Sequence, residues 1–168
     1  MTAGTGSVTG SIAYLEQQPW IMNDTMRANV LFGREYDAEF FARVIHGCAL
    51  TEDIVVWPNA DLAAISERGI NIPGGQRARL ALAHTLYSRV DIYVLDDPIS
   101  AVDAHVKLHI LEHVLLDTGM LAGKLRILAD KMSMRDAPGK SNQEYLARLV
   151  QPWFRARSRP LRIKRGVV

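Results

Sequence analysis

A short apolar run that ends in two adjacent carboxylates most constrains what this chain can fold into. Residues 92–95 are rich in β-forming side chains and predict a strand that is buried on both faces, as in a parallel sheet. Asp96 and Asp97 follow directly, and Pro98 ends the strand. Two acids at the end of a buried strand require an explanation, because an unpaired carboxylate is costly to bury.

The two carboxylates have two interpretations. In open α/β sheets, ligands bind beyond the carboxyl ends of the strands, and Mg²⁺ prefers one or two carboxylates together with phosphate oxygens. The run therefore indicates a site for a magnesium-bound nucleotide. Taken alone, it also fits a junction between a strand and a turn whose two acids face solvent.

A glycine-rich turn upstream of this strand supports the nucleotide interpretation. Residues 73–75, Pro-Gly-Gly, open a run whose apolar residues recur at helical spacing, namely Ala78, Leu82, Ala83, Leu86 and Tyr87. The free N–H groups at the start of a helix attract anions, and paired glycines let a phosphate approach the backbone.

Together these two stretches resemble the ATPase domain of ABC transporters. Residues 67–79 match Glu-Arg-Gly-Ile-Asn-x-x-Gly-Gly-Gln-x-Ala-Arg, and residues 96–106 match Asp-Asp-Pro-x-Ser-Ala-Val-Asp-Ala-His-Val, in the family's order and spacing. The chain is most similar to the first nucleotide-binding domain of the multidrug-resistance-associated (C) subfamily of exporters. The resemblance implies an α/β fold, a partial P-loop NTPase (ABC ATPase) fold with a parallel sheet core and a small helical subdomain. It also implies ATP and Mg²⁺ as ligands.

The resemblance divides the chain into two regions. Residues 1–131 correspond to a partial ABC ATPase domain, with a helical subdomain at 37–75 and the signature at its end. Residues 132–168 diverge from the family and carry six basic residues and no acid from Val150 onward. We expect this segment to be a solvated, disordered tail, with contact to nucleic acid or acidic lipid as the alternative.

A glutamine pair follows the strand that we expect at residues 11–15. The resemblance identifies Gln17 as the Q-loop glutamine, whose side-chain oxygen reaches Mg²⁺ and the attacking water. An alignment shifted by one residue assigns that role to Gln18. A neutral amide suits the role because it coordinates without a change of protonation. A plain polar loop is the alternative interpretation.

The segment between the Q-loop and the signature predicts short helices. One of residues 23–25 is expected to cap a helix that closes at Gly33. Residues 37–50 show an amphipathic pattern, and Thr51 is expected to cap a further helix that ends before Pro58.

The signature departs from the family's pattern at one position. Pro73 replaces the serine that normally offers a hydroxyl to the γ-phosphate of ATP held by the partner domain, and proline has no donor. Gly74, Gly75 and Gln76 remain to contact phosphate and ribose. We therefore expect closure of the composite site to be weakened but not abolished.

The resemblance also assigns roles around the two carboxylates. Asp96 would hold Mg²⁺ through water, whereas Asp97 stands where active ATPases carry a catalytic glutamate and is one methylene shorter. Asp103 would cross the dimer interface and help to position the partner's site. Lys131 stands at the switch-histidine region, where it could attract phosphate but could not shuttle a proton as imidazole does. The candidate catalytic residues are Asp97, Gln17 and Lys131, and the candidate metal ligands are Asp96 and Gln17.

Three histidines recur at helical spacing after this motif. His105, His109 and His113 stand at i, i+4 and i+8, a spacing that can make a metal-binding face. No cysteine lies nearby to complete a site, although Glu112 is adjacent. The alternative, a structural helix, agrees with the family's pattern.

The composition is that of a globular domain of ordinary size, with 168 residues, 48% of them apolar and 23% charged. No run of 18 or more apolar residues occurs, so we expect no membrane span within the chain. The single cysteine, Cys48, excludes an internal disulfide, fits a reducing compartment and is expected in the core.

The sequence contains no Gly-x-x-x-x-Gly-Lys-[Ser/Thr] loop to cradle phosphates. In the resembling family, a segment such as residues 1–10 lies just after the phosphate-binding loop and its helix, so Met1 is interpreted as an internal methionine and the chain as a fragment or a truncated gene model. We expect this chain to be marginally stable and to bind ATP weakly at best. The first functional hypothesis is an ATP-binding and ATP-hydrolysing module of an exporter. It would act at the cytoplasmic face of a membrane with a second nucleotide-binding domain and membrane-spanning domains.

The second functional hypothesis is a non-catalytic fragment that docks on transporter domains without turnover. Nucleic-acid binding is the weakest hypothesis, because no such module is recognisable.

Overall fold

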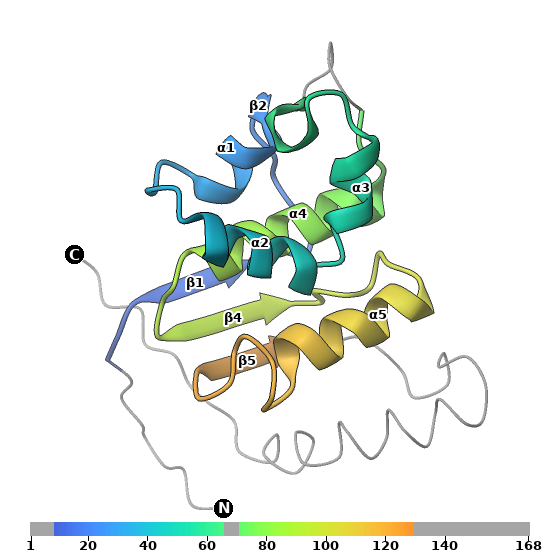
Figure 1. Cartoon of the computed structure of the whole chain (residues 1–168). Helices are drawn as coiled ribbons and strands as arrows, with labels where there is room; N and C mark the ends of the chain where they lie inside the picture. Colours follow the sequence, from blue (N-terminus) through green and yellow to red (C-terminus); the bar gives the residue numbers. More distant parts are fainter. Residues whose placement is uncertain (1–8, 66–70, 130–168) are drawn as a thin grey trace, which may run out of the picture. The chain divides into compact units, whose positions relative to one another are not determined.

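A parallel sheet forms one layer of the fold. The computed structural model describes residues 9–65 and 71–129 (Figure 1). Within these described ranges, the sheet has three strands in the order β1–β4–β5, and both pairings are parallel. Its strands are β1 Ile12–Leu15, β4 Ile92–Asp96 and β5 Leu125–Ala129.

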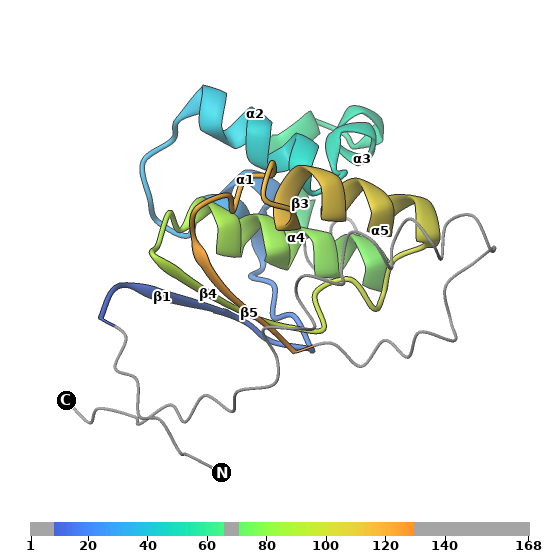
Figure 2. The ribbon, with the colours of Figure 1, turned by 90° about the horizontal axis from the view of Figure 1, so that it is seen from below.

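The central strand, β4, is the apolar run that ends in two carboxylates. Ile92, Tyr93 and Leu95 are buried and Val94 is half-buried, so the predicted buried strand of a parallel sheet is confirmed. The helices α4 and α5 lie on the same side of the sheet, with α2 and α3 beyond α4 (Figure 2). The sheet itself exposes apolar side chains on its two outer strands, at Ile12, Tyr14 and Leu125.

The helix after the Pro-Gly-Gly turn, α4 Gly74–Tyr87, joins the sheet to the smaller helices. It begins directly after Pro73, which occupies the N-cap position with φ −57° and makes no side-chain capping bond. The predicted helix start is therefore confirmed. The buried residues of α4 form the interface between the two layers, and they include Leu80, Ala81, Leu82, Ala83, Leu86 and Tyr87.

The first helix of the subdomain is α1 Met26–Leu31. The Oγ1 atom of Thr25 accepts a hydrogen bond from the N–H of Ala28 at 3.0 Å, which is the predicted cap. The chain leaves the helix through Phe32 and Gly33, with φ of 46° and 80°. The left-handed backbone at Gly33 is the conformation that glycine adopts without steric cost, so the predicted closure is also confirmed.

The next two helices are α2 Ala38–Gly47, which Asp37 caps, and α3 Thr51–Val56. The predicted cap at Thr51 is wrong, because Thr51 is already the first helical residue. The N-cap is Leu50, which makes no side-chain capping bond. Leu50 is fully buried, so core packing rather than a polar cap determines where α3 begins.

Short elements complete the subdomain, and a further helix precedes β5. The antiparallel pair β2 Asp24–Thr25 and β3 Ala64–Ile65 flanks the 3₁₀ turn η1 Ala60–Leu62. The helix α5 Ala104–Ile110 continues into the π-helical turn η2 Leu111–Leu115.

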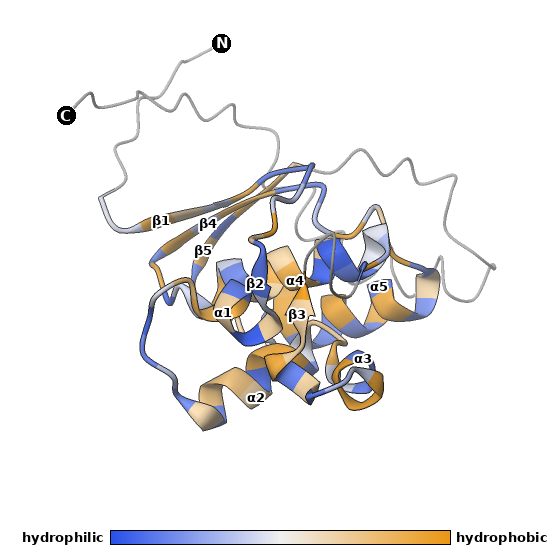
Figure 3. Cartoon of the chain, turned by 90° about the horizontal axis from the view of Figure 1, so that it is seen from above, coloured by the Kyte–Doolittle hydropathy of each residue, from blue (hydrophilic) through white to orange (hydrophobic). Residues whose placement is uncertain are grey.

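Cys48 lies in the core, as expected, and burial raises the pKa of its thiol. By contrast, the side chains of Val55 and Val56 on α3 are exposed. Figure 3 shows that part of the α3 ribbon has the colour of hydrophobic residues. Among the described residues, no helix has both the length and the apolar character needed to cross a membrane. The predicted tail, residues 132–168, lies outside the described residues.

A largely buried polar cluster fastens α4 to α3. The carboxylate of Asp53 accepts a hydrogen bond from Gln76 Nε2 at 2.6 Å. It also forms an ion pair with Arg79 Nη1 at 2.7 Å. Arg79 also donates to the carbonyl of Ala49. The side chains of Arg79 and Asp53 are only 13% and 15% exposed, so this ion pair is far less solvated than a surface pair.

The first turn of α4 also touches the segment that follows β4. A Cβ atom on Gly75 would lie 3.0 Å from the carbonyl oxygen of Ala101. A Cβ on Gly74 would meet no atom within 4 Å. Gly75 is thus needed for close packing, whereas Gly74 has no steric neighbour in the part of the chain that the structure describes.

We predict that Asp53→Ala lowers the free energy of unfolding by roughly 3 kcal/mol, because it leaves a mostly buried guanidinium without its carboxylate. Urea unfolding of the 168-residue chain measures the loss. Asp61→Ala is the control: it removes the more exposed pair with Arg27, at 2.6 Å, and should cost about 1 kcal/mol or less. Equal losses in the two variants would show that burial does not strengthen the Asp53 contact.

A second prediction separates the two glycines. Gly75→Ala should destabilise the chain by about 1–3 kcal/mol, because the new methyl group presses on backbone that cannot rotate away. Gly74→Ala should be neutral or stabilising by up to about 1 kcal/mol, since alanine favours the helix and finds open space. Thermal unfolding of both variants checks the contrast. A Gly75 variant as stable as the Gly74 variant contradicts it.

Candidate functional site

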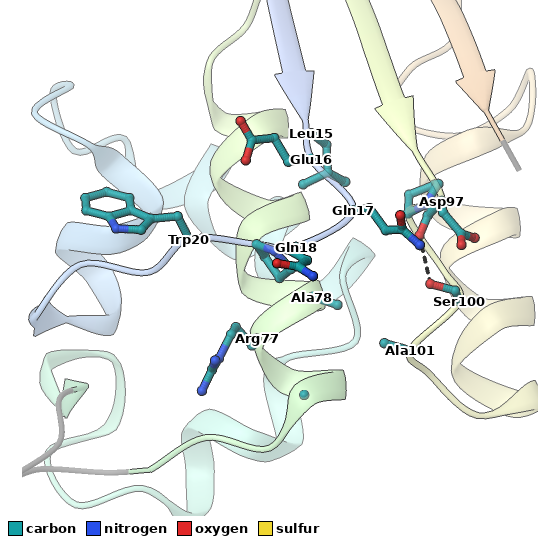
Figure 4. Close-up of a pocket in the computed structure, with 13 residues that line it drawn as sticks. Leu15, Glu16, Gln17, Gln18, Trp20, Arg77, Ala78, Asp97, Ser100 and Ala101 are labelled. Atoms are coloured by element: carbon teal, nitrogen blue, oxygen red, sulfur yellow. Dashed lines mark hydrogen bonds between the residues drawn. The ribbon is translucent and has the colours of Figure 1, made fainter.

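Two predicted residues meet at the carboxyl end of the sheet. Leu15 of β1 is paired with Leu95 of β4, so Gln17 and Asp97 each lie two residues past the paired position. Both line one cavity of about 500 Å³ (Figure 4). The parallel register therefore brings together an amide and a carboxylate that are 80 positions apart in the chain.

The start of α4 forms another wall of this cavity. Gly74, Arg77 and Ala78 line it together with Ser100 and Ala101, which follow β4. In Figure 4 the Gln17 side chain points toward the segment that holds Asp97 and Ser100, whereas Trp20 and Arg77 point away from that segment. The cavity thus lies between the loop that follows β1, the start of α4 (called the signature helix below) and the turn after β4.

The backbone of Asp97 is held in a tight turn. Its φ is 54°, a left-handed conformation that aspartate tolerates better than most residues. Its N–H donates to the carbonyl of Ala129 at 2.6 Å, and its own carbonyl accepts from Ser100 Oγ at 3.2 Å. These bonds fix the half-buried residue at the cavity while its carboxylate is not needed for the turn.

Asp96 occupies a different environment from its neighbour. It is the last residue of β4, and its carboxylate accepts a long hydrogen bond of 3.4 Å from the hydroxyl of Tyr14 on β1. Partial burial, followed by the charges of Asp96 and Glu16, raises the pKa of Tyr14. Asp96 is not among the residues that line the cavity. Of the two predicted metal ligands, the structure brings only Gln17 to the cavity, and the prediction for Asp96 stays a prediction.

The four signature residues, 73–76, make different contacts within the chain. Gly74 lines the cavity, and Gly75 packs on Ala101. Gln76 donates to Asp53, and Pro73 precedes the helix without capping it. Their predicted contacts concern ATP held by a second domain, so these contacts remain a prediction for the chain.

Asp103 has a clear structural role at the start of α5. Its Oδ1 accepts hydrogen bonds from the N–H groups of Val106 and His105, both at 3.0 Å. These bonds, led by the one from Val106, lower the pKa of the Asp103 carboxyl. Its predicted role across a dimer interface stays a prediction. Lys131, the third candidate catalytic residue, lies outside the described residues.

The residues at the cavity fit a magnesium-bound phosphate in part. Gln17 and Asp97 supply the oxygen atoms that Mg²⁺ prefers, whereas Arg77 lines the cavity with its side chain directed away from Asp97. The first-turn N–H groups of α4 have no side-chain cap, which leaves them able to bind an anion. A volume of about 500 Å³ lies within the usual range for small-molecule sites.

The sequence analysis did not identify Arg77 as a site residue. Arg77 stands three positions after Gly74 in α4, so the two residues lie on neighbouring parts of one helix face. A ligand site at Gly74 therefore predicts that Arg77, three positions later in the helix, also lies near that site.

The predicted histidine face needs a correction. The imidazoles that converge are those of His46, His109 and His113, and not that of His105. His46 belongs to the last turn of α2, which is far from α5 in the sequence. Helical spacing predicts which histidines share a face, but it cannot predict which neighbouring helix covers part of that face.

Comparison with known proteins agrees with the geometry. No family model matches the chain. The chain is 50% identical over 126 residues to the protein named "Metal resistance protein YCF1" from the yeast Saccharomyces cerevisiae. This match covers 75% of the chain. It is 52% identical over 122 residues, 73% of the chain, to mouse "ATP-binding cassette sub-family C member 2". It is 50% identical over 125 residues, 74% of the chain, to "Multidrug resistance protein mrp-7" of Caenorhabditis elegans.

These matches span only 8% of the length of each relative. By its sequence and by its partial nucleotide-binding fold, this chain belongs to the multidrug-resistance-associated proteins, sub-family C of the ATP-binding cassette transporters.

Proposed function

We propose that the chain forms part of an ATP-binding and ATP-hydrolysing module of an exporter, which couples these steps to transport across a membrane. The meeting of Gln17, Asp97 and Gly74 at one cavity is the observation that carries this proposal. The amide of Gln17 and the carboxylate of Asp97 offer the oxygen atoms that Mg²⁺ prefers, and the uncapped helix start at Gly74 can bind a phosphate of the nucleotide that a second domain holds.

Each of these residues has a distinct task in the proposal. When bound, magnesium-ATP supplies the phosphoanhydride bond that is hydrolysed. Gln17 offers its amide oxygen to the metal or to a water molecule, without a change of protonation. Asp97 accepts a proton from that water, over a reach one methylene shorter than glutamate would have. Asp96, which does not line the cavity, would hold the metal only through water.

The signature residues act on nucleotide that a second domain holds. Gly74 has open space around it, so a phosphate from outside the chain can approach its backbone. The Gln76 side chain is bonded to Asp53 at 2.6 Å and must exchange this bond to contact a ribose. Asp103 lies exposed at the start of α5, where a second domain can reach it.

Exposed apolar side chains support contact with further domains. Trp20 is 70% exposed and meets the ring of Phe32 edge-on, with the centroids 6.5 Å apart. On α3, Val55 and Val56 are 78% and 77% exposed. We propose that these surfaces face membrane-spanning domains, which places the module at the cytoplasmic face of a membrane as part of a transporter.

A non-catalytic role is the alternative. Asp97 stands in place of the family's glutamate, Pro73 stands in place of its serine, and the 168 residues contain no phosphate-cradling loop. A chain with these features could dock on transporter domains without turnover.

A chimera distinguishes the two roles. The matching segment of mouse sub-family C member 2, 122 residues at 52% identity, is replaced by this chain's sequence. If Asp97 is a working base, Asp97→Glu should raise ATP turnover by about tenfold and Asp97→Asn should lower it by at least that factor, as expected for general-base catalysis. Asp61→Asn, on the remote turn η1, is the control and should change little. Identical turnover in both Asp97 variants would favour the docking role.

The same chimera tests the proline in the signature. Pro73→Ser restores a hydroxyl that can donate to phosphate, a charge-assisted bond typically worth about 1.5–3 kcal/mol. We predict that it raises ATP turnover by roughly tenfold or more, since about 1.4 kcal/mol corresponds to a factor of ten. Pro58→Ser, at an exposed loop position, is the matched control. Unchanged turnover in the Pro73 variant would show that the proline does not limit closure of the site.

A further inference from the structure

Three histidines from different parts of the chain form a cluster away from the nucleotide cavity. One ring nitrogen from each of His46, His109 and His113 lies within 4.8 Å of the other two. The rings of His109 and His113 are stacked, with centroids 4.1 Å apart and an angle of 16° between their planes. The His46 ring meets both edge-on, at 5.1 and 4.9 Å.

Close packing of α2 on η2 brings His46 to this position. A Cβ atom on Gly47 would lie 3.0 Å from Met120 Sδ and 3.2 Å from Val114 Cγ2, so a larger residue would require these side chains to shift. Val114 and Ile110 are fully buried, which fixes η2 and the end of α5 below the histidines. The cluster therefore stands on a rigid base.

Hydrogen bonds to carbonyl oxygens orient two of the rings. His109 Nε2 lies 2.7 Å from the carbonyl oxygen of His46, and His113 Nδ1 lies 2.9 Å from the carbonyl oxygen of His109. A carbonyl only accepts, so these nitrogens carry the protons. His109 Nδ1 and His113 Nε2 are then the nitrogens with lone pairs, as in metal sites where the second ring nitrogen donates to a carbonyl.

The electrostatic environment favours neutral imidazole at His46. Partial burial and the nearness of His109 and His113 lower the pKa of His46. Neutral imidazole is the form of histidine that binds metal.

We propose that His46, His109 and His113 form a binding site for a borderline divalent transition-metal ion, with Zn²⁺ as the representative. Three imidazoles suit Zn²⁺, Ni²⁺ or Cu²⁺, whereas Mg²⁺ and Ca²⁺ require oxygen ligands. Water completes the fourth position. Zn–N bonds of about 2.0–2.1 Å require the nitrogens to close to roughly 3.3 Å, which small side-chain rotations on this accessible surface allow.

A bound ion would link two segments that are 63 residues apart, the end of α2 and the α5–η2 helix. This links the helical subdomain to the sheet layer independently of ATP. Because the ion binds the folded arrangement, it stabilises that arrangement in proportion to the free metal concentration.

The test uses the 168-residue chain without an affinity tag. Calorimetry with Zn²⁺ should show one ion per chain, and the thermal midpoint should rise with Zn²⁺ but not with equal Mg²⁺. Co²⁺ in place of Zn²⁺ should give the visible absorption of a four-coordinate nitrogen site. His109→Ala should weaken Zn²⁺ binding by at least about tenfold, because even losing an outer-sphere partner of a metal site costs 10–100-fold.

His105→Ala is the matched control, since His105 lies one turn earlier on the same helix and outside the cluster. It should bind Zn²⁺ as the unaltered chain does. His46→Gln, a second variant with little change in volume, should also lose binding while its circular dichroism without metal stays unchanged. Absence of a one-to-one Zn²⁺ complex, or equal loss in the His105 and His109 variants, overturns the proposal.

Discussion

The parallel pairing of β1 with β4 determines where the functional groups of this molecule lie. Because Leu15 is opposite Leu95, the two loops that follow these strands begin at the same level, and Gln17 and Asp97 meet. A shift of one residue in this register would turn every side chain of β1 to the other face of the sheet. The cavity therefore depends on burying Leu15 and Leu95 on the face that α4 covers.

The signature helix provides the second half of this geometry. Its first turn reaches the segment after β4 because Gly75 has no side chain, and it is fastened to α3 through the carboxylate of Asp53. The residue with no steric neighbours, Gly74, is also the one at the cavity. Packing and ligand access are thus assigned to two adjacent glycines, and a single glycine could not serve both purposes at these positions.

Local chemistry made much of this fold predictable. The properties of a few adjacent residues predict the strand that ends in two carboxylates, the helix start after Pro-Gly-Gly and the helix cap at Thr25. The cap at Thr51 was not predictable in this way, because burial of Leu50 decides where α3 begins. The histidine cluster was predicted only in part, since no pattern within α5 reveals that α2 contributes His46.

The outer strand β1 has a consequence for the behaviour of the chain in solution. Its side chains Ile12 and Tyr14 are 59% and 55% exposed, and within the described residues it lies at one margin of the sheet. An apolar strand in that position can add a strand from another molecule by backbone hydrogen bonding. Such pairing would bring Ile12 and Tyr14 beside side chains of the added strand, and a charged side chain introduced at Ile12 would disfavour it.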